Sequence, residues 1–356
     1  MFFYLSLFLL FVAIYKWAEL DGRWWALLIA ILIPALFEGL RDDVVGRDML
    51  GYGGNWFFLM DENEELSSML EFAQTPEYAY HLLISLCKKI SQNIHLFMTA
   101  CALIKMSAVT LFAYRMREQL SSVLFLFSYY CFFYVLGFSM MRQGIAVAIC
   151  IYSLVYYMRN EIWRFLLMVV IAFLFHNSAV LMLLLIPLYY IRNLSYKYVI
   201  ILGSIAFVYF SVEILFELVL MTPLFKSEMA DLYIDSGVPS AKSNLFISSV
   251  FLCYGAYQYF FEDEEANENT YMLIVTSAVT LMFLLLSSYI EVAFRMSYYM
   301  YIVSLTIVLT FVFDSERYRC IKECAFIALF LLFFYIECTH GLADALDYTS
   351  NILDIT

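Results

Sequence analysis

Long apolar runs separated by short polar linkers fill almost the whole chain. Stretches such as Ile200–Phe210 and Phe326–Phe334 are almost continuously apolar, whereas the strands of a membrane β-barrel alternate apolar and polar residues. A helix that spans a bilayer needs roughly 20 mostly apolar residues and satisfies its own backbone polar groups. The pattern predicts an all-α polytopic membrane protein. Its 12 expected segments lie near 2–17, 24–40, 94–114, 121–139, 143–158, 165–175, 178–191, 198–220, 244–261, 271–290, 292–313 and 324–339.

The composition agrees with this pattern. The 356 residues are 64% hydrophobic and 15% charged, while a soluble domain is about half apolar and a quarter charged. We therefore expect residues 1–356 to form a single transmembrane domain. Residues 1–17 lack a basic start and a cleavage site, so we interpret them as a retained first helix and not a signal peptide.

The charge and the cysteines exclude some classes of function. The net charge of −12 argues against a nucleic-acid partner. The eight cysteines show neither a C-x-x-C pair nor zinc spacing, so we expect no disulfide framework and no metal site.

The positive-inside rule sets the expected topology, because Lys and Arg collect in cytoplasmic linkers. Alternate short linkers hold most of the basic residues, and we place these linkers in the cytoplasm. They contain Lys16, Arg23, Arg115, Arg117, Arg159, Arg164, Arg192, Lys197, Arg317, Arg319 and Lys322. Both termini then lie outside, together with the external loops 41–93 and 221–243 and the tail 340–356.

The first external loop contains a predicted helix near residues 76–90. Thr75-Pro76-Glu77 suits an N-cap, a proline at the first helical position and an acid in the first turn. Apolar residues follow at helical spacing; they are Leu82, Leu83, Leu86 and Ile90. We expect an amphipathic helix that lies on the outer membrane surface or packs over the mouth of a cavity.

Residues 165–175 and 178–191 are two short apolar arms between basic linkers. Arms of this length rise about 16–21 Å, which is short of a roughly 30 Å bilayer core. We therefore predict a short broken hairpin with its break near His176–Ser178, facing protein or a water-filled cavity. A single long tilted helix is the alternative, and it would reverse the sidedness of everything downstream.

Few cations remain once the cytoplasmic linkers are assigned, and they lie on the external side at helix ends. They are Arg41, Arg47, Arg142 and Arg295. His176 points toward the same side. Each has a simpler interpretation: an arginine can reach lipid headgroups, and His176 can be a packing residue. The loop acids can solvate the loop or pair with its arginines; they are Asp42, Asp43 and Asp48.

Four unpaired cations on one face would repel each other, so a shared anionic ligand is the stronger hypothesis. The planar fork of arginine suits phosphate. The chain has no P-loop and no dinucleotide fingerprint, which disfavours a nucleotide. A lipid-linked pyrophosphate fits better.

Several motifs in this order resemble the EpsG type of bacterial polysaccharide polymerase, related to O-antigen polymerases of the Wzy kind. The motifs are Gly39–Arg41 with Gly46 and Asp48, Met141–Ala146, Phe175–Ala179 and Phe294–Arg295. The resemblance covers residues from about 30 to 310. Family members usually carry a Thr-Asp pair where Arg47 and Asp48 stand.

The resemblance implies a GT-C-like membrane glycosyltransferase that joins lipid-linked repeat units at the periplasmic face of the bacterial inner membrane. The donor would be a growing glycan on undecaprenyl pyrophosphate and the acceptor a single lipid-linked unit. It also implies partnership with a chain-length regulator and a flippase. We expect no cofactor and no metal, because guanidinium groups would replace a cation.

An acceptor hydroxyl needs a base, and the departing pyrophosphate needs positive charge. We assign His176 as the base or acceptor-orienting group, with Asp48 as the alternative base. The residues that we assign to substrate or pyrophosphate binding are Arg41, Arg47, Arg142, Gln143 and Arg295. Two other functions remain open: a flippase for lipid-linked sugars, since broken helices also occur in transporters, and a ligase of the O-antigen type.

Overall fold

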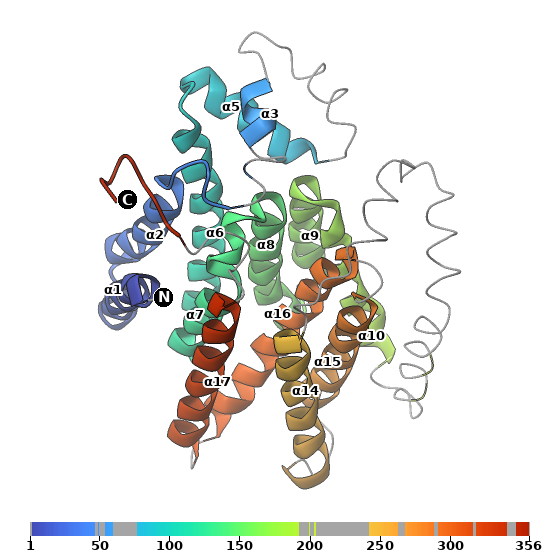
Figure 1. Cartoon of the computed structure of the whole chain (residues 1–356). Coiled ribbons are helices and arrows are strands. Elements are labelled where there is room, and N and C mark those ends of the chain that lie inside the picture. Colours follow the sequence, from blue (N-terminus) through green and yellow to red (C-terminus); the bar gives the residue numbers. More distant parts are fainter. Residues whose placement is uncertain are drawn as a thin grey trace, which may run out of the picture. The chain divides into compact units, whose positions relative to one another are not determined.

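The computed structural model describes residues 2–46, 49, 54–59, 77–191, 199, 203, 242–262, 268–287, 291–315, 318–339 and 347–355. These residues form helices, with one isolated β-bridge between Ser350 and Ile355. They divide into two compact units, residues 1–180 with 312–356 and residues 181–311. Figure 1 shows the helices of both.

The first unit is built around α6, which packs against α2 and α8. Next to them, α1 packs on α2, and α9 packs on α8 and α5. The helices are α1 (Phe2–Asp21), α2 (Trp24–Gly39), α3 (Gly54–Leu59), α5 (Tyr78–Ile90), α6 (Ile94–Met116), α7 (Ser122–Tyr129), α8 (Met141–Met158), α9 (Ile162–Phe175) and α17 (Arg319–Thr339).

The second unit contains α10 (Leu185–Ile191), α14 (Lys242–Tyr257), η6 (Gln258–Glu262), α15 (Glu268–Leu286) and most of α16 (Glu291–Asp314). Side-chain contacts hold these helices together. Ser304 of α16 donates a hydrogen bond to Thr276 of α15 at 2.8 Å, and the rings of Phe251 and Tyr301 join α14 to α16 at 5.7 Å.

Within the part of the chain that the structure describes, five helices are long and apolar enough to cross a membrane. They are residues 3–21, 94–116, 141–158, 268–286 and 292–314. Four shorter apolar helices accompany them. The prediction of an all-α membrane protein is confirmed. The number of 12 segments and the GT-C-like architecture stay predictions, and the segment 198–220 and the loop 221–243 lie almost wholly outside the described residues.

The segment expected near 121–139 is not one regular helix. The α-helix α7 passes into a π-helix, η2 (Tyr130–Tyr134), and then into a 3-10 helix, η3 (Leu136–Phe138). We call this stretch from Ser122 to Phe138 the composite helix. Such departures from α-geometry often mark functional positions. Here the composite helix ends directly before α8.

The break predicted near His176 is confirmed. Helix α9 ends at Phe175, and His176 has an extended backbone with φ −157° and ψ 125°. A 3-10 helix, η4 (Asn177–Leu184), follows it. The change of backbone conformation at His176 separates α9 from η4.

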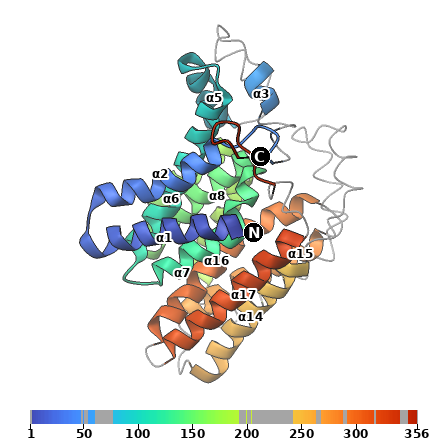
Figure 2. The ribbon, with the colours of Figure 1, turned by 60° about the vertical axis from the view of Figure 1, so that its left-hand side comes forward.

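The C-terminal residues lie against the end of α2, as Figures 1 and 2 both show. The Tyr348 ring stacks on Phe37 at 4.3 Å, and its hydroxyl donates to the Phe37 carbonyl at 2.7 Å. Asp42 N–H donates to the Thr349 carbonyl at 2.9 Å. These contacts hold the loop that follows α2.

Candidate functional site

Three side chains that are far apart in the sequence meet in the first unit. Glu77 immediately precedes α5, Arg142 is the second residue of α8, and His176 follows α9. One carboxylate oxygen of Glu77 accepts a hydrogen bond from Arg142, and the other lies 2.5 Å from Nδ1 of His176. We call these three residues the Glu77 cluster.

Local backbone structure explains how each side chain reaches the cluster. Glu77 occupies the N-cap position of α5, but its side chain makes no capping bond, so the carboxylate is turned toward the other helices. Arg142 lies in the first turn of α8. His176 donates its backbone N–H to the Ala172 carbonyl at 2.9 Å, the last bond of α9, and its own extended backbone then ends the helix.

Glu77 is the most deeply buried of the three, with a side chain that is 2% exposed, compared with 18% for Arg142 and 20% for His176. Burial by itself raises the pKa of Glu77, but the hydrogen bond from His176 and the charge of Arg142 outweigh it. The net pKa lies below the ordinary value of 4.5. Glu77 is therefore a carboxylate at neutral pH.

The ionised state of Glu77 fixes the proton on His176. A carboxylate only accepts hydrogen bonds, so Nδ1 of His176 must donate to it. In a neutral imidazole the other nitrogen, Nε2, then carries the lone pair. The cluster holds His176 in the tautomer that can take a proton at Nε2.

Aromatic rings surround the Arg142 guanidinium. Its Cζ atom lies 4.8 Å from the ring centroid of Trp56 and 6.0 Å from that of Tyr80, distances at which a cation is attracted to a ring face. His81 packs at 4.6 Å from Trp56 and bonds the Glu77 carbonyl through Nδ1 at 2.8 Å. Burial lowers the pKa of His81, so it adds no charge here at neutral pH.

Two predicted site residues, Arg142 and His176, are thus brought together, and a third residue that the sequence did not single out joins them. Glu77 was expected as a first-turn acid, but α5 begins at Tyr78 and Glu77 precedes it. Arg142 was expected at a helix end, and it lies in the first turn of α8. Its neighbour Gln143 is 3% exposed.

The structure places Arg41 differently from the expected external contact. The side chain is fully buried. Its guanidinium donates to the carbonyls of Val45 at 3.1 Å, Glu38 at 2.5 Å and Phe138 at 3.0 Å. A pyrophosphate could reach Arg41 only if these bonds broke, so we assign it to holding its own loop.

The remaining predicted site residues lie elsewhere. Arg295 is near the start of α16, in the second unit, and stays a prediction. Arg47 and Asp48 lie outside the described residues. Within those residues, no group of three or more His, Cys, Asp or Glu side chains is arranged to hold a metal ion.

Comparison with known proteins identifies the chain over nearly its whole length. No curated protein and no solved structure gives a match. The model of the EpsG family matches residues 24–350, a range that contains the Glu77 cluster and every described helix except α1. The match indicates a membrane protein of the polysaccharide polymerase type. The chain belongs to the EpsG family.

Proposed function

We propose that the chain is a polysaccharide polymerase that joins repeat units carried on undecaprenyl pyrophosphate. The transfer takes place at the periplasmic face of the bacterial inner membrane. Family membership and the long apolar helices support the class of protein. One observation carries the chemistry: a single buried carboxylate binds both an arginine and a histidine.

His176 is the general base in this proposal. Its Nε2 takes the proton of an acceptor hydroxyl while the hydroxyl oxygen forms a bond to the anomeric carbon of the donor sugar. Glu77 holds the ring through Nδ1 and stabilises the imidazolium that forms. A histidine oriented by a carboxylate is the arrangement that serves this purpose in unrelated transferases and hydrolases.

Arg142 stabilises the leaving group. As the bond between the anomeric carbon and the pyrophosphate oxygen breaks, the oxygen keeps the electron pair and gains negative charge. A guanidinium has five N–H donors, so Arg142 can hold Glu77 with one nitrogen and an anionic oxygen with another. The rings of Trp56 and Tyr80 lie beside it and help to hold the cation in place.

The charge of the Glu77 cluster changes in the required direction during the reaction. When His176 starts in its neutral form, the Glu77 and Arg142 charges cancel before transfer. After His176 takes the proton, the cluster carries one net positive charge beside the departing pyrophosphate. A site that gains positive charge as the leaving group gains negative charge stabilises the transition state more than the bound substrate.

The other predicted residues complete the proposal. Arg295 is the second pyrophosphate contact, and Gln143 and Arg47 bind substrate. Asp48 remains the alternative base. No step is assigned to a metal or cofactor, and we expect the chain to act with a chain-length regulator and a flippase.

Glycan length after reconstitution tests the function. The purified chain in liposomes is supplied with an undecaprenyl-pyrophosphate-linked repeat unit, and the products are separated by length. A ladder that is lost in Arg142→Ala and His176→Ala supports the polymerase. A single transferred band indicates a ligase, movement of substrate across the bilayer without new bonds indicates a flippase, and either would overturn the proposal.

A further inference from the structure

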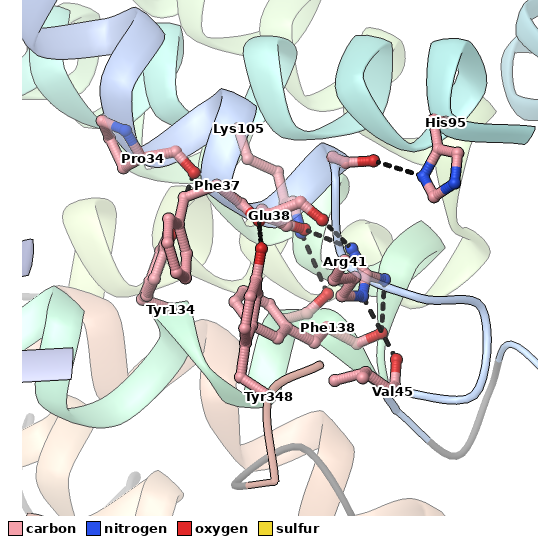
Figure 3. Close-up of polar contacts among 12 residues, drawn as sticks. Pro34, Phe37, Glu38, Arg41, Val45, His95, Lys105, Tyr134, Phe138 and Tyr348 are labelled. Atoms are coloured by element: carbon pink, nitrogen blue, oxygen red, sulfur yellow. Dashed lines mark hydrogen bonds and ion pairs between the residues drawn. The ribbon is translucent and has the colours of Figure 1, made fainter. Parts of the chain in front are cut away.

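Three charged side chains are buried together in the first unit (Figure 3). Glu38 lies in the last turn of α2, Arg41 in the loop after it, and Lys105 near the midpoint of α6. Each is at most 1% exposed. The Lys105 ammonium donates to the Glu38 carboxylate, and Arg41 lies 3.9 Å from the same oxygen. We call these residues the Glu38 cluster.

The Glu38 cluster carries two cations and one anion, and both cations also bind the end of the composite helix. The composite helix ends at Phe138, and the last carbonyls of a helix carry partial negative charge. Lys105 donates to the Gly137 carbonyl at 2.9 Å, and Arg41 donates to the Phe138 carbonyl at 3.0 Å. The two cations therefore cap the end of the composite helix.

Two glycines make room for the Lys105 side chain. A Cβ atom on Gly137 would lie 3.2 Å from the Lys105 ammonium nitrogen, and one on Gly144 would lie 3.3 Å from Lys105 Cδ. Both distances are shorter than ordinary packing contacts. Gly144 belongs to the Met141–Ala146 motif, and the structure shows that a larger residue at this position would press on Lys105.

The capped carbonyls lead directly into α8. Met140 N–H donates to the Leu136 carbonyl at 3.1 Å, and Gly144 N–H donates to the Met140 carbonyl at 2.6 Å. Arg142 lies within this turn. The direction in which α8 begins, and with it the direction of the Arg142 side chain, follows from how the end of the composite helix is held.

We propose that the Glu38 cluster positions the start of α8 and thereby aims Arg142 at its anionic ligand. Glu38, Arg41 and Lys105 are positioning residues that do not touch the substrate. A buried ion pair adds little stability compared with apolar packing, whereas bonds from cations to two helix-end carbonyls fix a geometry that apolar side chains cannot. The ligand named here rests on the proposed function; the positioning of Arg142 does not.

Cross-linking tests the positioning without any glycan substrate. Glu77→Cys and Arg142→Cys are introduced together, the exposed Cys253, Cys320 and Cys324 are changed to serine, and a short thiol cross-linker is added. We expect Lys105→Met to lose most of the cross-linked product. Arg115→Met, which removes an exposed cation from the same helix, should retain it.

Gly144→Ala provides a second variant, because it keeps every charge and only displaces Lys105. If Lys105→Met does not fold, cross-linking is measured in Gly144→Ala instead. We expect Gly144→Ala to lose cross-linked product as well. Unchanged cross-linking in the folded variants would overturn the positioning role and leave the proposed function standing.

Polymerisation kinetics test whether Lys105 acts through Arg142, by comparing Lys105→Met in the wild-type chain and in an Arg142→Lys variant. In the wild-type background, Lys105→Met should lower kcat by about 10- to 100-fold, since small misplacements of a catalytic group have effects of this size. Arg142→Lys lacks the planar guanidinium whose direction matters. In that background, Lys105→Met should lower kcat much less. Equal fold-losses in both backgrounds would contradict action through Arg142. Lost cross-linking with normal polymerisation would instead refute the role of Arg142 in the transfer step and retain the positioning.

Discussion

Replacing Glu77 by glutamine changes one carboxylate oxygen into an NH2 group at a side chain that is 2% exposed. Both neighbours of that carboxylate are donors, Arg142 and Nδ1 of His176. A glutamine amide has one acceptor oxygen, so its nitrogen must face one of them. In Glu77→Gln, therefore, either one of the two bonds is lost or His176 must change its tautomer.

The size of the loss follows from the kind of bond. A hydrogen bond to a charged group contributes about 1.5–3 kcal/mol, which corresponds to about a 10- to 150-fold slower reaction at 1.36 kcal/mol per factor of ten. If the amide nitrogen faces His176, the ring keeps its bond only by moving its proton to Nε2. The Nε2 lone pair is then lost, so kcat should fall more than KM rises.

The assay is the initial rate of ladder formation by the reconstituted chain. Glu161→Gln is the matched control, because Glu161 also binds an arginine, Arg164, at 2.5 Å, but their side chains are 33% and 68% exposed. Exposed pairs contribute little, so this variant should behave like the wild type. If folded Glu77→Gln polymerises as fast as Glu161→Gln, the Glu77 cluster has no part in the chemistry.

Three other outcomes follow from the structure. Because the pKa of Glu77 is lowered from 4.5, its ion pair stabilises the fold above that pH and is lost as the pH falls through the folded pKa. The difference in Tm between wild type and Glu77→Gln should therefore be fully present at neutral pH and shrink as the pH falls below 4.5; a constant difference would contradict this. Gly46→Ala should destabilise by about 3 kcal/mol or more, because φ is +99° and a Cβ would lie 2.6 Å from a backbone oxygen. Gly22→Ala, at φ +64° with open space around it, should cost about 1–2 kcal/mol, and thermal unfolding in detergent compares the two. Trp56→Ala removes the ring beside Arg142 and should weaken binding of a pyrophosphate lipid in a direct binding assay, while an unchanged Kd would show that the ring does not support the cation.

Properties that depend on neighbouring residues could be predicted from the sequence. Apolar runs determine membrane helices because the bilayer leaves a backbone few other ways to bond. The length of the arms around His176 predicted a break, and α9 ends there. The helix near 76–90 followed from its spacing and begins within two residues of the expected position.

Charge pairing was decided only by the tertiary structure. Glu77 lies 65 residues before Arg142 and 99 before His176, and Lys105 lies 67 residues after Glu38. No local pattern relates such positions, because folding chooses a partner by which helices pack together. The sequence alone therefore identified Arg142 and His176 as unusual, but it treated Arg41 as an external cation and Glu77 as a helix-start acid. Packing of α5, α8 and α9 made Glu77 the centre of the site, and packing of α2 on α6 made Arg41 part of the core.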